Sequence, residues 1–300
     1  MSLRNKLWLA VLLNLFFCTG SFAQDQELLA LLEDSVADNG QDVFATFKTT
    51  RIVNSHSIET VKHRGLDFRV THHFGDVAGG AGGIHSLYGL DQASDIRIAF
   101  EYGINDKLTA GFGRSKVNEL LDGYLKYRLL SQTLDNRLPV SATVMLGGAL
   151  NPQKASEGGY NSLEQRLSYT FQLLLARKFE RISVQLMPTL LHRNYVFGPD
   201  EKNDVFALGV GGRWKMTKRF ALLADYFYSF HDDRRTGTVE QYNPLGIGIE
   251  IETGGHVFHM FFTNNAGIAE SNFLSNTNSS WRKGEFKFGF NISRVFNIGS

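Results

Sequence analysis

The stretch LDFRVTHHF at residues 66–74 places mainly apolar side chains at every second position, with polar side chains between them. A period of two belongs to a β-strand, in which neighbouring side chains point to opposite faces. One face of this segment is therefore apolar, while the other carries Asp67 and Arg69. How often the pattern recurs along the chain decides the fold.

The same alternation recurs in eleven further segments, which reach almost to the end of the chain. They cover residues 96–102, 108–112, 121–127, 140–146, 167–175, 182–190, 206–210, 220–228, 245–251, 258–262 and 286–296. A tilted strand needs about 9–11 residues to cross the hydrocarbon layer of a membrane, and most of these segments allow that length. The sequence therefore predicts twelve strands.

Short and long connections alternate between the predicted strands. Short turns are expected at residues 103–106, 180, 215–218 and 253–255, and long polar or glycine-rich loops at residues 75–93, 151–163, 196–203, 231–242 and 264–283. The brief 116–120 loop and the long 131–138 turn depart from this order. An even number of antiparallel strands with short turns at one end and long loops at the other is the plan of a bacterial outer-membrane barrel. Both termini then lie at the short-turn, periplasmic end.

The polar face of the predicted strands is rich in charge, and we expect it to line the lumen. The candidate lumen-lining residues are Asp67, Arg69, Asp95, Arg97, Glu101, Asp122, Lys126, Arg128, Arg213, Asp225, Glu250 and Lys287. A soluble barrel has the reverse arrangement, with an apolar interior. The 24 Phe and 10 Tyr, many near segment ends, suit aromatic girdles at two lipid interfaces. A transmembrane barrel is therefore favoured over a soluble β-barrel or a two-domain β-sandwich.

Composition and the last strand indicate the partners of such a barrel. The 31 Lys and Arg against 30 Asp and Glu give a formal charge of +1, which argues against nucleic acid as a partner. The last segment alternates up to Phe296 and is similar to the aromatic-ended strand that barrel-assembly machinery reads, although four residues follow it. We expect outer-membrane lipid and that machinery as partners, together with a small-molecule permeant.

The first residues read as a secretory signal peptide. Arg4 and Lys6 precede an apolar run at residues 7–17, and small residues precede a cleavage site after Ala23. An N-terminal anchor and a lipoprotein acylated at Cys18 are the alternatives. Because Cys18 is the single cysteine, the mature chain has no disulfide or thiolate site.

The predicted organisation is a signal peptide at residues 1–23, an N-terminal segment at residues 24–61 and the barrel at residues 62–300. The N-terminal segment joins a short Leu-rich stretch to an extended polar one. It is either a plug, placed in the lumen or its periplasmic mouth, or a periplasmic tail or thirteenth strand. Its candidate plug residues are Lys48, Arg51, His56 and Glu59.

Several stretches together resemble a known family. They are ATFK at residues 45–48 through HSIE at residues 56–59, GLDFR at residues 65–69, LYGLDQA at residues 87–93, YGI at residues 102–104 and NPLG at residues 243–246. Over roughly the whole mature chain, the sequence resembles bacterial outer-membrane β-barrel proteins catalogued as a domain of unknown function. The resemblance implies a β-barrel in the outer membrane and no assigned activity.

Catalytic and metal sites are weakly indicated, and we expect no cofactor, metal or catalytic residue. His72-His73 and the pair His256 and His259 would point to opposite faces of their strands, so a metal would need a site across strands, for instance His73, His259 and Glu250. The glycine runs at residues 79–83 and 209–212 lack the context of a phosphate loop.

A lipid hydrolase has to be weighed because some twelve-stranded outer-membrane barrels are lipases. His56-Ser57 and His85-Ser86 are adjacent in sequence, which is no evidence of the hydrogen bond that a serine nucleophile needs. No G-x-S-x-G motif is present. Hydrolase activity is the least favoured function.

The lumen charges allow two interpretations. Either they line a water-filled path and select permeants, or they neutralise one another across a closed interior. We expect a narrow or partly plugged polar lumen that passes or binds a small molecule. The alternatives are a non-conducting structural or interaction barrel and the lipid hydrolase.

Overall fold

The computed structural model describes residues 42–154, 159–198, 201–230, 235–236 and 239–299. The expected signal peptide, its cleavage site and the Leu-rich part of the N-terminal segment fall outside the described residues. No described helix is long and apolar enough to cross a membrane.

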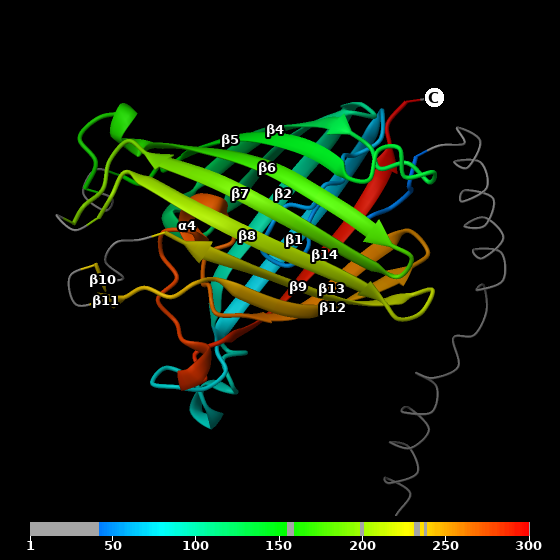
Figure 1. Ribbon diagram of the computed structural model, residues 1–300. Helices are drawn as coiled ribbons and strands as arrows, with labels where there is room; N and C mark the ends of the chain where they lie inside the picture. The colour runs from blue at the N-terminus through cyan, green and yellow to red at the C-terminus, as the bar shows by residue number, and fades with distance from the viewer. Residues whose placement is uncertain (1–41, 155–158, 199–200, 231–234, 237–238, 300) are drawn as a thin grey trace, which may run out of the picture. The chain divides into compact units, whose positions relative to one another are not determined.

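Twelve of the described strands form one closed barrel, in which neighbours in sequence are antiparallel neighbours in space (Figure 1). They are β1 (Gly65–Asp76), β2 (Ala93–Asn105), β3 (Leu108–Ser115), β4 (Leu121–Leu130), β5 (Ser141–Leu150), β6 (Leu167–Phe179), β7 (Ile182–Arg193), β8 (Asp204–Lys215), β9 (Phe220–Ser229), β12 (Leu245–Thr253), β13 (His256–Thr263) and β14 (Lys287–Asn297). The last strand pairs with the first, from Gly65 opposite Asn297 to Asp76 opposite Lys287. All twelve predicted strands are confirmed, as is the antiparallel barrel that they form.

The connections follow the predicted alternation. Turns 106–107, 131–140, 180–181, 216–219 and 254–255 lie at one end of the barrel, called here the short-turn end, where β1 also begins and β14 stops. Connections 77–92, 116–120, 151–166, 194–203, 230–244 and 264–286 lie at the opposite, long-loop end. The two connections that broke the sequence pattern, 116–120 and 131–140, fit this assignment by position.

Short elements shape the long-loop end. They are the 3-10 helices η2 (Ile84–Ser86), η3 (Val117–Glu119), η4 (Glu164–Arg166) and η5 (Trp281–Lys283), the two-stranded sheet of β10 (Arg235–Thr236) and β11 (Val239–Glu240), and the helix α4 (Glu270–Phe273). Helix α4 packs against β6 and β7 from inside the barrel (Figure 1). The sequence patterns did not indicate these elements.

The strand period divides each strand into an outer and an inner face. On β2, Ile98, Phe100 and Tyr102 are 48, 46 and 36% exposed, whereas the alternating Arg97 and Glu101 are buried. Exposed aromatic side chains on the outer face cluster toward strand ends, as at Phe179, Trp214, Phe220, Tyr228 and Phe296. This arrangement, with apolar side chains outside and charge inside, is that of a barrel in lipid.

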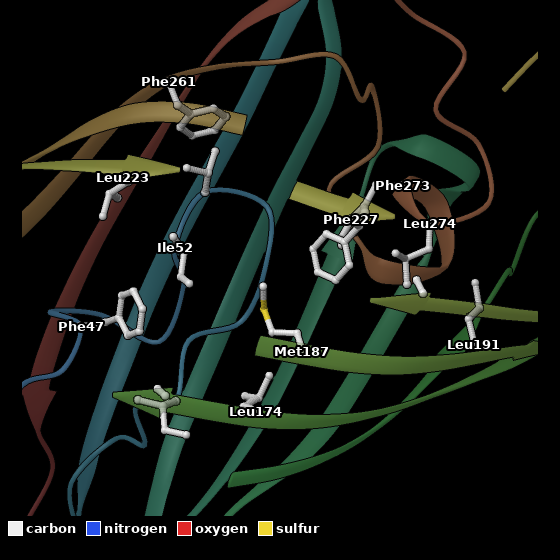
Figure 2. Close-up of a cluster of buried hydrophobic side chains, with 14 of the residues drawn as sticks. Phe47, Ile52, Leu174, Met187, Leu191, Leu223, Phe227, Phe261, Phe273 and Leu274 are labelled. Atoms are coloured by element: carbon white, nitrogen blue, oxygen red, sulfur yellow. The ribbon is translucent and has the colours of Figure 1, made fainter. Parts of the chain in front are cut away.

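The inner face is not polar all round, contrary to our expectation. Figure 2 shows an apolar cluster inside the barrel, formed mainly by the inward side chains of β6 to β9. It includes Leu174, Met187, Leu191, Leu223 and Phe227. These positions are apolar because a segment of the chain packs against them from within, so they contact protein and not water.

Candidate functional site

Residues 42–61 are called here the plug. Nearly all of residues 46–58 are buried inside the barrel, whereas residues 42–44 lie at its short-turn end, where Asp42 is bridged to Thr133. The plug backbone folds into a hairpin in which the Ile52 N–H donates to the Ser55 carbonyl and the Ser57 N–H to the Thr50 carbonyl, both at 2.9 Å. Arg51 and His56 face each other in an antiparallel bridge. Ile52 and Ser55 are therefore opposite each other, and the turn between them consists of Val53 and Asn54. Asn is a residue type that stabilises turns. The hairpin makes its own main-chain bonds and adds no strand to the barrel wall.

The tip of the hairpin closes around one carboxylate of the wall, that of Asp225 on β9. Oδ2 of Asp225 accepts the backbone N–H groups of Val53, Asn54 and Ser55 at 3.1, 2.7 and 2.8 Å, and the Ser55 hydroxyl at 2.8 Å. Its Oδ1 accepts the side-chain amide of Asn54 at 2.8 Å. Successive N–H groups that converge on one anion form a nest. Asp225 therefore anchors the plug tip.

Side chains of other strands bind the plug's carbonyl oxygens. Lys126 on β4 donates to the carbonyls of Thr50, Ser57 and Glu59 at 3.4, 3.1 and 3.0 Å. Further donors to plug carbonyls are Thr143 on β5, Ser183 and Gln185 on β7, bound to Ile58, Thr46 and His56 respectively. Buried peptide groups need such partners, so the polar wall serves the plug as a set of hydrogen-bonding partners.

Most lumen charges are paired. Arg69 contacts Asp67 at 2.6 Å and Glu101 at 3.8 Å, and the Thr50 hydroxyl of the plug lies between Arg69 and Glu101. Other pairs are Arg97–Asp122, Arg213–Glu250, Arg213–Glu252, Lys287–Asp76 and, from the plug, Lys48–Glu252 and Arg128–Glu59. A buried charge is tolerated only when it is paired and hydrogen-bonded. In the plugged structure these charges neutralise one another.

Helix α4 connects the plug with the long-loop end. Glu270 accepts a hydrogen bond from Arg51 at 2.8 Å, and its Oε1 lies 3.4 Å from the His56 ring. The His56 ring is fully buried against Tyr124, with ring centres 4.5 Å apart. Burial, together with Arg51 and Lys126 nearby, lowers the pKa of His56 well below its ordinary value. His56 is therefore neutral at pH 7.

A cavity of about 450 Å³, called here the vestibule, opens above the plug at the long-loop end. Its walls come from described residues at positions 118–120, 151–153, 159–168, 193–197 and 201, and its floor from residues 271–276, at and just beyond α4. A smaller space of about 20 Å³ beneath it is lined by His56, Tyr124 and Glu270. Ser271 borders both spaces, so α4 separates the vestibule from the plug.

The structure places the residues predicted for the lumen and the plug as follows. Asp67, Arg69, Asp95, Arg97, Glu101, Asp122, Lys126, Arg213, Asp225, Glu250 and Lys287 are buried on the inner face, and Arg128 is half-buried there. In the plug, Arg51 and His56 are buried, while Lys48 and Glu59 are half-buried. Asp95 does not face the plug, because its carboxylate accepts the N–H groups of Val117 and Ile268 and so positions two long-loop connections.

Sequence reasoning missed several residues of this site. Thr50, Tyr124 and Glu270 gave no signal, because their roles depend on contacts between distant segments. Asn54 and Ser55 did carry a turn signal, and it would have predicted the hairpin tip. Gly211 lies in the glycine run at residues 209–212, and a Cβ there would lie 2.5 Å from Ile52 Cδ1 of the plug. Its small size makes room for the plug.

The cross-strand metal site and the serine–histidine pairs considered from the sequence are not formed in the structure. His259 lies 3.3 Å from Glu250, whereas His73 contacts the Ala266 carbonyl, and no group of three or more metal-binding side chains occurs among the described residues. The hydroxyls of Ser57 and Ser86 donate to the carbonyls of Thr49 and Gly83, not to a histidine.

Comparison with known proteins adds the following. The model of one protein family, described as a membrane bound beta barrel domain (DUF5777), matches residues 47–296. No curated protein matches the sequence. Solved structures similar to the chain include the COG4313 outer membrane channel from Pseudomonas putida F1, at 15% identity and a TM-score of 0.49, covering 80% of this chain and 98% of that one. Another is a NanC porin, at 10% identity and a TM-score of 0.48, covering 78% and 100%.

Proposed function

The chain belongs to the family of membrane-bound β-barrel domains (DUF5777), and we propose that it is a bacterial outer-membrane barrel that admits a small polar molecule. In this proposal the molecule binds in the vestibule, at the outer mouth, and passes through a lumen that the plug closes at rest. The long loops face the outside of the cell and the short turns face the periplasm, as in other barrels of this plan.

The observation that carries the proposal is that the plug is separable from the wall. Its main-chain bonds close its own hairpin, and wall side chains hold it through Asp225 and Lys126. At its first residues, the Val43 N–H donates to the carbonyl of Gln132 in turn 131–140. Withdrawing the plug therefore breaks no ladder bond of the twelve barrel strands. A wall whose strand ladders do not include the plug, and which is polar over much of its inner face, supports a path that can open.

The position of the vestibule supports binding before passage. Its floor is the segment that starts at α4, and the Glu270 side chain of that helix contacts Arg51 of the plug. A molecule that binds in the vestibule thus meets residues directly connected to the closed path. A site unrelated to passage would not need to adjoin the plug.

One observation favours a second function, a barrel that binds at its mouth without conducting. The lumen of the closed structure is filled, its charges are paired, and an apolar cluster joins the plug residues Phe47, Ile52, Val53 and Ile58 to the wall. Such packing resists displacement. Conductance separates the two functions.

The experiment compares single-channel conductance of the mature chain in a planar bilayer with that of a chain lacking residues 24–59. We expect rare, brief openings from the mature chain and larger, sustained steps from the shortened one. Because the shortened chain exposes buried wall charges, Asp225→Asn in the full mature chain provides a milder variant, and the exposed Asp204→Asn is its control.

Heat-modifiable migration on gels reports whether each variant holds a folded barrel. More frequent openings in Asp225→Asn than in Asp204→Asn support passage through an unplugged lumen. Silence from all variants with folded barrels would overturn passage and leave the non-conducting binding barrel.

A further inference from the structure

The vestibule wall contains a cation without an acidic partner. Arg166 uses its Nη1 group to donate to the carbonyls of Asn151 and Gln153, and its guanidinium lies 5.5 Å from the centre of the Tyr160 ring. Among the described residues, no carboxylate lies within ion-pair distance of Arg166. Arg193 differs, because it pairs with Glu201 at 2.9 Å. The described charges of the vestibule therefore leave one positive charge uncompensated.

Two buried hydrogen-bond donors that belong to the lining of the same cavity have no partner among the described residues. The side-chain NH₂ of Asn272, a residue only 4% exposed, has none, while its carbonyl oxygen accepts the amide of Asn118 at 2.9 Å. The Nε of Arg193 is the second. An unsatisfied buried donor costs free energy that an acceptor can recover. Both residues line the vestibule, so we look for that acceptor in a molecule bound there.

One side of the vestibule is aromatic. Tyr160, Tyr195 and Phe197 contact one another edge-on, with ring centres 5.1–6.0 Å apart. Burial raises the pKa of Tyr160 above its ordinary value, so its hydroxyl stays neutral. Aromatic rings next to polar donors form a wall for a ring-shaped molecule with a polar edge.

We propose that the vestibule binds a small organic carboxylate, with the carboxylate group at Arg166 and Asn272 and its ring against the tyrosines. The one uncompensated positive charge among the described lining residues matches a carboxylate of charge −1 better than a phosphate monoester, which carries about −1.5 to −2 at neutral pH. A cavity of about 450 Å³ lies within the usual range for small-molecule sites. The inference rests on the proposed function, since it names the ligand class of the same site.

The test is titration calorimetry on the folded mature chain in detergent with three probes: glucuronate, glucose and benzoate. Glucose has the ring of glucuronate without its charge, and benzoate replaces the sugar ring with an aromatic one. We expect glucuronate or benzoate to bind at least about tenfold more tightly than glucose, which corresponds to one charge-assisted hydrogen bond. Whichever acid binds better identifies the kind of ring. Binding should also weaken with added salt.

Three variants locate the site. Arg166→Gln should reduce acid binding to the level of glucose, and Arg166→Lys should retain part of it because it keeps the charge. Arg137→Gln, an exposed arginine at the short-turn end, is the matched control and should bind as the parent chain does. Gel migration checks that each barrel is folded.

Equal affinity for glucose and both acids, no binding of either acid, or undiminished binding by a folded Arg166→Gln variant would overturn the proposal. The proposed function fails separately. If the barrel binds glucuronate but never conducts, the proposed binding site stands and passage through the lumen is refuted. If it conducts but binds acids no better than glucose, passage stands and the carboxylate ligand is refuted.

Discussion

The backbone N–H of Ser55 in the plug lies 2.8 Å from the Asp225 carboxylate on β9, and this contact joins segments 170 residues apart in sequence. The same oxygen also accepts the N–H groups of Val53 and Asn54, so one wall carboxylate holds three consecutive peptide groups. Charge-assisted hydrogen bonds are about twice as strong as neutral ones. Asp225 is thus the wall residue that fixes where the hairpin tip lies.

Asp225→Asn should release the plug tip. An amide has one acceptor oxygen and an NH₂ that would face the N–H donors of the hairpin, so at least one donor loses its partner. We expect the plug to be destabilised by about 1.5–3 kcal/mol, the usual contribution of hydrogen bonds to a charged group. Hydrogen exchange at the amides of residues 53–55 measures this loss. Exchange as slow as in the parent chain would show that Asp225 is not the anchor.

Gly246→Ala should displace the plug without changing any charge. A Cβ at this inward position of β12 would lie 2.6 Å from Val53 Cγ1 and from the side-chain nitrogen of Asn54. Overpacking of this kind costs about 1–3 kcal/mol. Gly212→Ala is the control, because a Cβ there approaches nothing closer than 3.7 Å. Faster amide exchange at residues 52–57 in Gly246→Ala alone would confirm the tight fit, and equal exchange in both variants would contradict it.

The strands of the barrel wall could be predicted from the sequence, for a simple physical reason. Each strand has lipid on one side and the barrel interior on the other, so apolar and polar side chains alternate along it. The neighbouring residues Phe100 and Glu101 show by their polarity alone which faces outward and which faces inward. Every strand of the barrel repeats the same requirement. Because the rule is local, the twelve strands can be predicted without any knowledge of distant contacts.

The alternation of apolar and polar side chains could not predict the apolar part of the interior or the contacts of the plug. Leu174, Met187 and Leu223 occupy inward positions on strands whose outer face is apolar too, so alternation of polarity fades there. Those positions pack against Phe47 and Ile52, which are more than one hundred residues away in sequence. The Arg51–Glu270 pair has the same origin, since no periodicity connects a hairpin with a loop helix.

Acid should loosen the plug through His56. Its pKa in the folded chain is well below the 6.5 of a free histidine, because burial and the cations Arg51, Lys126, Arg97 and Arg69 all disfavour its charged form. Between the folded pKa and 6.5 the released plug therefore binds more protons than the buried one, and the plugged state loses stability as pH falls. Above 6.5 both states are neutral, and His56 adds no pH dependence there.

The measurement is amide exchange of residues 50–57, corrected for its intrinsic pH dependence, in the parent chain and in His56→Gln. The plug of the parent chain should become less protected below pH 6.5, and that of His56→Gln should lose less protection over the same range. Glu270, 3.4 Å from the ring, is present in both chains. Identical pH profiles would exclude His56 as the titrating group.

Glu270→Gln should weaken the contact between α4 and the plug more than the removal of both partners does. The side chains of Arg51 and Glu270 are 4% and 10% exposed and lie 2.8 Å apart, so the single change leaves a buried guanidinium without its counter-charge. Breaking such a pair costs about 3–5 kcal/mol, whereas replacing both members with apolar residues is often close to neutral. Arg51→Met combined with Glu270→Leu should therefore protect the Ser57 amide better than Glu270→Gln alone.

The exposed pair Arg114 and Glu119, 3.8 Å apart, provides the control for a double-mutant cycle, and its coupling energy should be about 0–1 kcal/mol. A coupling of similar size in the two cycles would mean that α4 and the plug are not joined through this pair, and that the vestibule floor moves independently of the closed path.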